Sequence, residues 1–598
     1  MKKKENATNR FRYLALASAL AAFLLIVVGT VLRVTGADCP DWPTCTGALL
    51  PPLSSGAALA HRLLALLSAP LFVATAVVAW RHYRRVRTII WPLAAALVLL
   101  GVQALWGGLV AVNHAAAGLV ALHLGLALLV MGLLVAVAVA AFVRDRDEQQ
   151  ADRLAFRSPF ARQSLVAALW LFVVLVSGAF VSASEATYAC SGWPLCNGEL
   201  IPSHPLGWVA MAHRLLVGLG GVYMLLLLNS AWRSQRSQRA ILSATTLTVV
   251  IYFSQFLMGA LKVSRQFPPY LIGLHAATAA AVWALAVVMV VLVGLAARSP
   301  QEEAEELAIP IDGRQRALDL LGLTKPIIVV LLLVTTYAGM VVAAHALPSL
   351  SLTFWTMLGG ALAAGGSGAV NQYIDRELDQ RMTRTAKRPI ASGRMTAAEG
   401  LAFGLSLLVI SFYVYAGFVN LLAALLALAG MIYYIILYSL WLKQATVQNI
   451  VIGGGAGAIP PMVGWAAATG QLAIPALFLF AIIFLWTPPH FWALALVRQK
   501  DYARAGVPML PVVRGEGVTR WQIFLYTLEL VALTLLFPIL GMAGSAFLVS
   551  ALVLGGLLIY VAWGVWRVGG NKIAWRMYRY SSMYLALLFA ALVVDALL

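Results

Sequence analysis

The chain has 598 residues, of which 62% are hydrophobic and 11% charged, and its formal net charge is +19. This composition predicts an integral membrane protein and excludes a disordered chain, a collagen-like fibre and a secreted disulfide scaffold. The positive charge lies mostly in short loops between apolar stretches and forms no continuous basic face. We therefore expect it to orient the chain in a lipid bilayer and to bind no nucleic acid.

Apolar stretches long enough to cross a bilayer recur along the whole chain. With about 20 apolar residues to a span, the sequence predicts eight spans between residues 14 and 296 and nine between 326 and 597. The first stretch, residues 13–31, follows a basic segment but ends without the small-residue cleavage site of a signal peptide, so we expect it to remain as a helix. The predicted fold class is an all-α membrane protein.

Basic loops alternate with nearly uncharged loops along the chain. By the positive-inside rule, the basic loops and the N-terminus lie in the cytoplasm. We expect a multi-pass protein of the cell inner (plasma) membrane, with its cysteine loops on the outer side.

The first half of the chain contains an internal duplication. The segment Cys39-Pro-Asp-Trp-Pro-Thr-Cys45 recurs as Cys190-Ser-Gly-Trp-Pro-Leu-Cys196, and an Ala-His-Arg-Leu-Leu segment follows each copy. The two repeats extend over about residues 10–143 and 162–298. Each predicts one four-helix bundle, so that two bundles form the first domain.

Four duplicated histidines are candidate haem ligands, namely His61, His123, His213 and His275. A rise of 1.5 Å per residue from the helix ends places each at a depth of roughly 10–15 Å. Axial ligation of a haem iron requires one imidazole on each face of the ring, and two histidines at matched depth on different helices supply them. The competing interpretation is that each histidine is a core residue with its own hydrogen-bond partner. It is disfavoured because all four histidines recur at the same offset within membrane spans, where a polar group is costly.

Each cysteine pair has five intervening residues and lies in an outer loop. An oxidising compartment favours a disulfide within each pair, Cys39 with Cys45 and Cys190 with Cys196. Two roles remain open for these pairs: a staple on a Trp-Pro loop, or a redox role in handling electrons or haem.

The paired cysteine loops, the twofold His-Arg-Leu-Leu segments and the eight spans resemble haem A synthase over about residues 10–298. The resemblance implies that His213 and His275 hold a permanent haem b, whereas His61 and His123 receive haem O as substrate. It also implies that a methyl group of the haem ring is oxidised to a formyl group.

The chain departs from that family at one position. Members often place a glutamate on the turn before the first histidine, where this chain has Ala57 and Ala58. If a carboxylate moves protons during methyl oxidation here, Asp38, Asp41 or Glu185 must supply it.

The longest polar interval lies between the two halves of the chain. Residues 299–325 contain Gln301-Glu-Glu-Ala-Glu-Glu306 and predict a solvated linker between a first domain, residues 1–298, and a second, residues 326–598.

The second half carries an oxygen-rich helix end, Asn371-Gln-Tyr-Ile-Asp375-Arg-Glu-Leu-Asp379. The i, i+4, i+8 spacing stacks Asn371, Asp375 and Asp379 on one helix face. Hard cations such as Mg²⁺ prefer oxygen ligands and share them with substrate phosphates. Cations that follow at once, among them Lys387 and Arg388, favour a metal-diphosphate site over a solvated acidic helix end.

Two later cytoplasmic loops repeat this chemistry, with Lys443 in one and Asp501 in the other. With Gly453-Gly-Gly-Ala-Gly457 and Trp486-Thr-Pro-Pro-His490-Phe-Trp492, this array resembles the UbiA-type membrane prenyltransferases, and among them haem O synthase, or protohaem IX farnesyltransferase, over about residues 318–598. The glycine run is no P-loop because no Gly-Lys-Ser/Thr follows it, and close packing of a membrane helix explains its small residues.

The physical interpretation of these residues is a prenyl transfer site. The residues expected to hold Mg²⁺ on the diphosphate of farnesyl diphosphate are Asp375, Asp379 and Asp501, with support from Asn371. The residues expected to neutralise the departing pyrophosphate are Lys443, Lys387 and Arg388. The spans shield the farnesyl cation from water until a vinyl group of haem B attacks it. His490 and His345 are candidates for contacting haem in this half.

The two resemblances concern consecutive reactions, so the sequence predicts a bifunctional enzyme that makes haem A for cytochrome c oxidase. Assembly factors of that oxidase are possible partners. A quinone-type aromatic prenyltransferase fused to a thiol-oxidising domain leaves the duplicated histidines unexplained. A transporter or dihaem electron carrier built on repeats leaves Asp375, Asp379 and the adjacent cations without a purpose.

Overall fold

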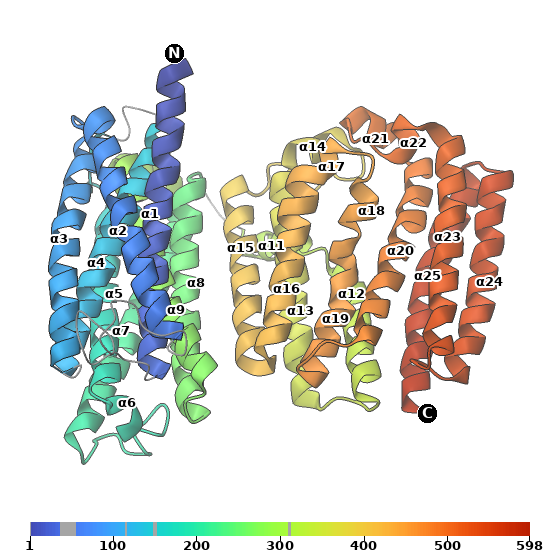
Figure 1. Cartoon of the computed structure of the whole chain (residues 1–598). Helices are drawn as coiled ribbons and strands as arrows, with labels where there is room; N and C mark the ends of the chain where they lie inside the picture. The colour runs from blue at the N-terminus through green and yellow to red at the C-terminus, as the bar shows by residue number, and fades with distance from the viewer. Residues whose placement is uncertain (1, 36–55, 114–115, 147–151, 309–311) are drawn as a thin grey trace. The chain divides into compact units, whose positions relative to one another are not determined.

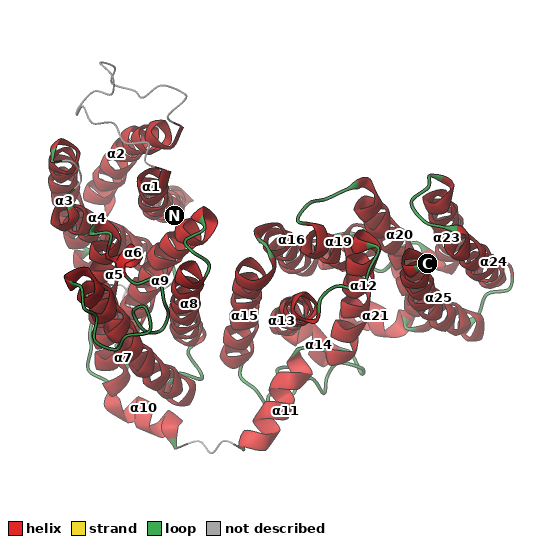
Figure 2. Cartoon of the chain, turned by 90° about the horizontal axis from the view of Figure 1, so that it is seen from below, coloured by secondary structure: helices red, strands yellow, loops and turns green. Residues whose placement is uncertain are grey.

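The computed structural model describes residues 2–35, 56–113, 116–146, 152–308 and 312–598, and over these ranges it contains helices and no strand (Figure 1). The chain divides into two compact units, Met1–Pro310 and Ile311–Leu598. Within each unit the long helices run roughly side by side, as the view along them in Figure 2 shows. The predicted all-α fold class is confirmed.

The first unit is built from two bundles of four long helices. In the first bundle, α1 packs on α2 and α4, and α3 packs on α4; in the second, α5 packs on α7 and α9, and α8 packs on α9. The helices of this unit are α1 (Lys2–Thr35), α2 (Gly56–Tyr83), α3 (Arg87–Val112), α4 (Ala117–Arg144), α5 (Pro159–Ala183), α6 (Ala186–Ala189), α7 (Pro205–Ser234), α8 (Arg239–Ser264), α9 (Pro269–Ala296) and α10 (Pro300–Leu307).

The second unit is a single larger helical bundle in which α13 packs on α15, α12 on α19, and α20 on α23 and α25. Its helices are α11 (Gly313–Leu323), α12 (Pro326–Ala344), α13 (Leu350–Ile374), α14 (Arg376–Arg381), α15 (Ala397–Val414), η3 (Tyr415–Val419), α16 (Leu421–Ile432), η4 (Tyr433–Leu442), α17 (Lys443–Ala445), α18 (Asn449–Gly453), α19 (Gly455–Thr469), α20 (Ile474–Val497), α21 (Gln499–Ala505), α22 (Leu510–Val513), α23 (Gly515–Ile539), α24 (Ser545–Arg567) and α25 (Asn571–Leu597). The segments η3 and η4 are π-helical.

Several helices begin at residues whose side chains cap them. Ser158 accepts a hydrogen bond from the Ala161 N–H, and Pro159 takes the first helical position of α5, where a missing N–H costs little. Thr396 and Glu399 form a reciprocal capping box at the start of α15. Local sequence therefore determines where these helices begin.

α4 and α9 join the two bundles of the first unit. The Trp283 indole on α9 donates a hydrogen bond to the Leu128 carbonyl on α4, with 2.7 Å between Nε1 and O. Gly132 of α4 lies under this indole, and a Cβ on Gly132 would be 3.1 Å from Nε1. A glycine therefore permits this close crossing, as small residues do in membrane helix pairs.

The predicted division into eight and nine spans is not confirmed. Sixteen described helices are long and apolar enough to cross a membrane, eight in each unit, and α13 is not among them. α13 is rich in glycine, and a Cβ on its Gly366 would be 2.9 Å from the Gly404 carbonyl oxygen on α15. The small residues that allow this approach also reduce the hydropathy of α13.

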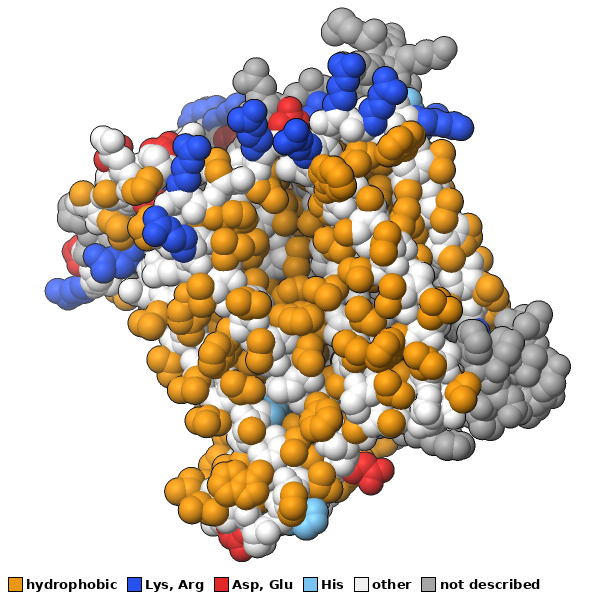
Figure 3. All heavy atoms as spheres, turned by 90° about the vertical axis from the view of Figure 1, so that its left-hand side faces the viewer, with side chains coloured by type: hydrophobic (Ala, Val, Ile, Leu, Met, Phe, Trp, Pro, Cys, Tyr) orange, Lys and Arg blue, Asp and Glu red, His pale blue; other side chains and the backbone are white. Residues whose placement is uncertain are grey.

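The surface of the first unit suits a bilayer. Figure 3 shows Lys and Arg side chains gathered at one end of its visible face and hydrophobic side chains over the region between the ends. Large apolar side chains such as Leu67 and Trp80 on α2 and Leu105 on α3 are exposed. In water such a surface would aggregate, whereas lipid tails solvate it.

The predicted solvated linker, residues 299–325, is largely helical and partly buried. Its α10 packs on the first unit, where Glu303 and Glu306 are 4% and 8% exposed. The Glu303 carboxylate accepts hydrogen bonds from the Phe160 N–H at 3.2 Å and from Gln235 Nε2 at 2.9 Å. The acidic run therefore differs from a fully solvated linker, because two of its carboxylates find donors at helix ends.

We expect Glu303→Ala to release α10 from the first unit, because the buried Phe160 and Gln235 donors lose their acceptor at a cost of about 1–3 kcal/mol each. Limited proteolysis of the full chain in membranes should then cleave within residues 299–325 more rapidly. Glu305→Ala changes an exposed glutamate of the same helix and is the matched control. Equal cleavage rates in the two variants would contradict this role for Glu303.

Candidate functional site

The histidines singled out by the duplication lie on α2, α4, α7 and α9. Each imidazole lies against a glycine of a neighbouring helix, and a Cβ on that glycine would be 3.0 Å from the imidazole Cε1. The four pairs are Gly29 with His61, Gly107 with His123, Gly178 with His213 and Gly259 with His275. Because 3.0 Å is shorter than an ordinary carbon–carbon contact, any larger residue at these positions would displace the ring.

Sequence analysis did not identify these glycines. Gly107 and Gly259 are separated by the same interval as His123 and His275, which is the signal that marks them as part of the repeat. Gly29 and Gly178 are matched less closely in spacing. A glycine in an apolar span has many other packing roles, so only the helix contact identifies its partner.

In each bundle the two rings are close enough to interact electrostatically. The pairs are His61 with His123 and His213 with His275. Two imidazoles on different helices inside a four-helix bundle are the arrangement that holds a haem iron between them. The first unit therefore contains two equivalent candidate haem sites, one in each repeat.

A glutamine accompanies one histidine of each pair. Gln103 Nε2 lies 3.3 Å from Nε2 of His123, and Gln255 Nε2 lies 3.2 Å from Nε2 of His275. Buried ring nitrogens need a hydrogen-bond partner, and these amides provide one. A metal that binds either ring through Nε2 would displace the amide.

The two bundles differ at the other ring nitrogen. In the second bundle Ser177 Oγ lies 2.8 Å from His213 Nδ1, and the Gln255 carbonyl oxygen lies 3.2 Å from His275 Nδ1. In the first bundle neither Nδ1 has a side-chain partner among the described residues: His61 has only the Leu25 backbone beside it, and His123 Nδ1 is buried without a partner. A hydrogen bond at Nδ1 orients a ligating imidazole and fixes its tautomer, so the rings of the second bundle are held more firmly.

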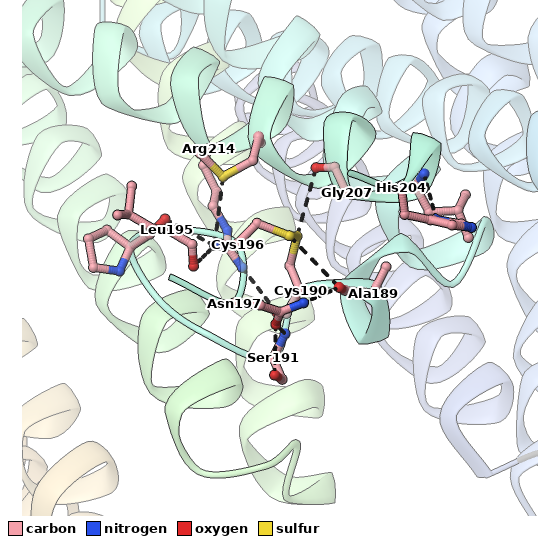
Figure 4. Close-up of a disulfide and its surroundings, with 12 residues drawn as sticks. Ala189, Cys190, Ser191, Leu195, Cys196, Asn197, His204, Gly207 and Arg214 are labelled. Atoms are coloured by element: carbon pink, nitrogen blue, oxygen red, sulfur yellow. Dashed lines mark hydrogen bonds between the residues drawn. A yellow bond between two sulfur atoms is a disulfide. The ribbon is translucent and has the colours of Figure 1, made fainter. Parts of the chain in front are cut away.

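The predicted disulfide between Cys190 and Cys196 is confirmed, and Figure 4 shows it in the loop that precedes α7. The Arg214 guanidinium donates hydrogen bonds to the carbonyl oxygens of Leu195 at 3.1 Å and Cys190 at 3.3 Å. The arginine that follows His213 therefore ties the cysteine loop to the helix that carries this histidine. The repeated sequence motif alone does not reveal this role.

Of the remaining loop candidates, only Glu185 belongs to the described residues. Cys39, Cys45, Asp38 and Asp41 lie outside the described residues. Glu185 is exposed at the start of α6.

The oxygen-rich helix end of the second unit is buried. Asn371 Nδ2 donates to Asp375 Oδ2 over 2.8 Å, and Lys443 Nζ donates to the same oxygen over 2.5 Å. The Asp375 side chain is 1% exposed, and its Oδ1 has no partner among the described residues. The structure thus brings three of the predicted site residues together and leaves one carboxylate oxygen for a ligand.

The other two acidic residues have their own donors. Arg388 Nη1 donates to both oxygens of Asp379, at 2.9 and 2.7 Å. Thr383 Oγ1 donates to Asp501 Oδ1 on α21 at 3.3 Å. Lys387, in contrast, is exposed, and no ion pair of its side chain is found within the described part of the chain. The structure does not bring Lys387 into this cluster.

Lys325, which the sequence placed at the end of the linker, belongs to the cluster. Its Nζ donates to Asn371 Oδ1 over 2.7 Å from the residue just before α12. Burial lowers the pKa of Lys325 to about 7; the charge of Arg388 acts in the same direction, and that of Asp375 opposes it. A lone lysine before an apolar span is also typical of an interfacial anchor, so its position in the sequence did not identify it.

The Asp375 carboxylate fits a cation that is shared with a substrate. Within the described ranges no three acidic, histidine or cysteine side chains converge on one metal position. Asp375, Asp379 and Asp501 therefore form no closed cage. Mg²⁺ is usually held by one or two carboxylates, while phosphate oxygens and waters complete its shell, and the unpartnered Asp375 oxygen fits that arrangement.

The π-helical segment η4 faces the cluster. π-Helical turns are rare and occur frequently at functional sites. Ser439 of η4 accepts a hydrogen bond from Asn371 over 3.1 Å. The rings of Tyr434 and Tyr438 stack with their centroids 5.6 Å apart, and a Cβ on Gly453 would be 2.3 Å from the Tyr438 ring. The glycine run thus serves helix packing, as expected.

The two histidines of this unit that are candidates for contacting haem, His490 and His345, have other surroundings than the Asp375 cluster. His490 Nδ1 lies 2.9 Å from Ser581 Oγ, and its buried ring lies against Trp486 and Tyr578. His345 is exposed at the C-terminal end of α12, a full membrane-spanning helix away from Lys325. These contacts make His490 a packed core residue in this structure.

Two family profiles match the chain. The UbiA prenyltransferase family matches residues 332–588, and the cytochrome oxidase assembly protein family matches residues 57–207. Both resemblances found from the motifs are confirmed.

Similar proteins named protohaem IX farnesyltransferase cover most of the chain. The protein from Roseiflexus sp. is 41% identical over 537 residues, which make up 85% of this chain and 98% of its own. The protein from Chloroflexus aurantiacus is 38% identical over 96% of both chains. The protein from Symbiobacterium thermophilum is 50% identical over 46% of this chain and 93% of its own.

Solved structures also resemble part of the chain. A UbiA homolog from Archaeoglobus fulgidus, bound to GPP and Mg²⁺, covers 46% of this chain and 99% of its own, with 18% identity and a TM-score of 0.36. A digeranylgeranylglyceryl phosphate synthase covers 47% of this chain and 99% of its own, with 17% identity and a TM-score of 0.42.

We expect Lys325→Met to raise the KM for farnesyl diphosphate about tenfold or more, since a charge-assisted hydrogen bond contributes roughly 1.5–3 kcal/mol. Lys325→Arg keeps the charge and should stay close to the wild type. Lys572→Met removes an exposed lysine at the start of α25 and is the matched control. The measurement is steady-state kinetics. Equal KM values for Lys325→Met and the wild type would contradict a role of Lys325 in binding.

Proposed function

The chain belongs to the protohaem IX farnesyltransferase family, and from this premise we propose that it converts haem B to haem A in two consecutive reactions. The second unit transfers a farnesyl group from farnesyl diphosphate to haem B and releases haem O. The first unit oxidises a methyl group of haem O to a formyl group. The observation that carries this proposal is the presence, in one chain, of a buried cation–carboxylate cluster and two histidine pairs.

Farnesyl transfer requires that the leaving pyrophosphate be neutralised. We assign this role to Lys325, Lys443 and Arg388, whose charges stabilise the diphosphate as its bond to carbon breaks. Hydrogen bonds to the amide and carboxylates at the end of α13 and in α14 hold these three cations before substrate arrives. Such preorganisation means that little reorganisation is required during the reaction.

The carboxylates of Asp375, Asp379 and Asp501 would hold Mg²⁺ beside the diphosphate, where the ion would supply further charge stabilisation to the leaving group. Cleavage of the bond leaves an allylic farnesyl cation. The apolar helices around the cluster exclude water until the vinyl group of haem B attacks this cation. Water then adds to the product cation and releases a proton to solvent, which completes the hydroxyethylfarnesyl group of haem O.

The first unit would use its two histidine pairs for different haems. His213 and His275 would retain a haem b, and His61 and His123 would take up haem O as substrate. The hydrogen bonds at Nδ1 of both rings in the second bundle support this division, because a retained haem needs firmly oriented ligands.

The charge distribution supports an orientation in the inner (plasma) membrane. We place the N-terminus, the basic loops and the Asp375 cluster on the cytoplasmic side and the Cys190–Cys196 loop on the outer side. The turn between α2 and α3 carries exposed Arg84 and Arg85 and would lie in the cytoplasm. Because the product is destined for cytochrome c oxidase, we also propose assembly factors of that enzyme as partners.

We expect Asp375→Asn to reduce haem O formation at least about 100-fold, because the amide keeps the shape of the side chain and loses the charge that a metal-bound diphosphate needs. The measurement is chromatography of haems extracted from cells that lack other haem O synthases. Glu377→Gln changes an exposed carboxylate on α14 and is the matched control. Normal haem O output by a well-expressed Asp375→Asn protein would contradict the assignment.

We expect His61→Ala and His123→Ala to accumulate haem O and to make little haem A, because the prenylation site is untouched while the oxidation site loses a ligand of its substrate. The same haem extraction measures both products. His82→Ala changes an exposed histidine at the end of α2 and should leave haem A unchanged. Haem B as the only haem would show that the order of the reactions is reversed.

A further inference from the structure

The two repeats of the first unit differ at one cation. Lys262 lies in the last turn of α8, and the first repeat has Val110 at the equivalent position of α3 when Gln103 is matched to Gln255. At this position the second bundle thus carries a positive charge where the first bundle has an apolar side chain.

Lys262 lies beside the histidine pair of its bundle. Gln255 and Gly259 of α8 lie against the His275 ring, and Lys262 follows them at i+7 and i+3 on the same face of that helix. The Lys262 side chain is half-buried, and its charge acts on the rings of both His213 and His275. The charged group found to act on it among the described residues is another cation, Arg214. Lys262 therefore borders the candidate haem site without an acidic partner from the described part of the chain.

Arg214 is already engaged elsewhere. Its guanidinium donates to the carbonyl oxygens of Cys190, Pro194 and Leu195 in the cysteine loop, at 3.0 to 3.3 Å (Figure 4). These hydrogen bonds use both of its terminal nitrogens. Of the two cations near this histidine pair, Lys262 is the one that remains for an anionic ligand.

A lysine in the last turn of a helix can simply stabilise the helix C-terminus. In a membrane helix such a lysine extends toward the interface and keeps its ammonium in water. Lys262 instead lies on the face of α8 whose Gln255 and Gly259 meet His275 inside the bundle. Removing a charge from water is unfavourable unless an opposite charge compensates, so the position of Lys262 indicates a bound anion.

We propose that Lys262 binds a carboxylate of a haem held between His213 and His275, and that this ion pair makes the second bundle retain its haem. A haem carries its two propionate carboxylates on one edge, so ligation of the iron at the depth of the rings brings that edge toward one end of the bundle. The inference deepens the proposed function and depends on it for the presence of haem at this histidine pair.

A second difference between the repeats acts in the same direction. Ser177, which bonds to His213 Nδ1, directly precedes Gly178, whereas Val28 precedes the equivalent Gly29. The first bundle therefore lacks both the cation and the hydroxyl. It is built to bind a haem less firmly, as a site that exchanges substrate for product requires.

The ion pair has a redox consequence that a purely structural lysine would lack. Ferric haem carries one more positive charge than ferrous haem, and a cation that neutralises a propionate therefore favours the ferrous form. Loss of Lys262 should lower the midpoint potential of this haem. The wavelength of its bands should not change, because both axial histidines remain.

The experiment compares purified full-length wild type with Lys262→Met and Lys262→Arg. The readouts are haem b content by pyridine haemochrome, the rate of haem transfer to apomyoglobin, and the midpoint potential of the b-type band. We expect Lys262→Met to lose haem about tenfold faster, as loss of a charge-assisted hydrogen bond implies, and to show a lower potential. Lys262→Arg should remain close to the wild type in both.

Val110→Lys is the mirror variant and introduces a cation into the first bundle. We expect more haem O to remain bound to this variant on purification and to leave it more slowly. If Lys262→Met does not accumulate in cells, Val110→Lys tests the inference by itself. Unchanged retention of haem O by Val110→Lys would then overturn the inference. Haem O synthesis reports folding, since its predicted site residues all lie in the other unit.

Two failures can be told apart. Lys262→Met with the haem loss rate and midpoint potential of the wild type would overturn the role of Lys262 while a haem is present. The other failure concerns the haem itself. If the wild-type protein shows no b-type spectrum, or if neither His213→Ala nor His275→Ala removes that spectrum, the proposed function of the first unit is overturned, and with it the premise of this inference.

Discussion

The interior of a bilayer offers no water to a polar side chain, and the arrangement of both units depends on this constraint. In the second unit the protein meets it internally, because Lys325, Lys443 and Arg388 each donate to an oxygen of a buried amide or carboxylate. In the first unit it is met only in part, since Lys262 lacks an acidic partner among the described residues. In the proposed enzyme, a carboxylate of the bound haem would complete what the protein leaves unsatisfied.

Close approach between helices is the second requirement of these sites. Each of the four duplicated imidazoles lies against the backbone of a glycine. In the second unit the ring of Tyr438 lies against Gly453 in the same way. A large side chain fits between closely packed helices only where the facing helix has a small residue such as glycine. Glycine therefore positions the functional groups in both units, although it supplies no chemistry itself.

Duplication followed by divergence would explain how one fold serves the two haems proposed for the first unit. The repeats share their histidines, their glutamines and the glycines under the rings, which preserves one ligand geometry. They differ at Ser177 and Lys262, which have Val28 and Val110 as their counterparts. Substitutions around a ligand, rather than of the ligand itself, are a general way to adjust affinity and redox potential.

The sequence by itself determined the membrane class, the eight spans of the first unit, the duplication, the Cys190–Cys196 disulfide and the helix face that joins Asn371 to Asp375. These features depend on local composition or on the period of a single helix, which a chain expresses without reference to its neighbours. Only the tertiary structure decided that Lys325 joins the carboxylate cluster, that Lys387 stays outside it, and that the acidic run of the linker is partly buried. Those outcomes are contacts between helices far apart in the chain, and they depend on how closely two surfaces pack, which no periodicity within one helix encodes.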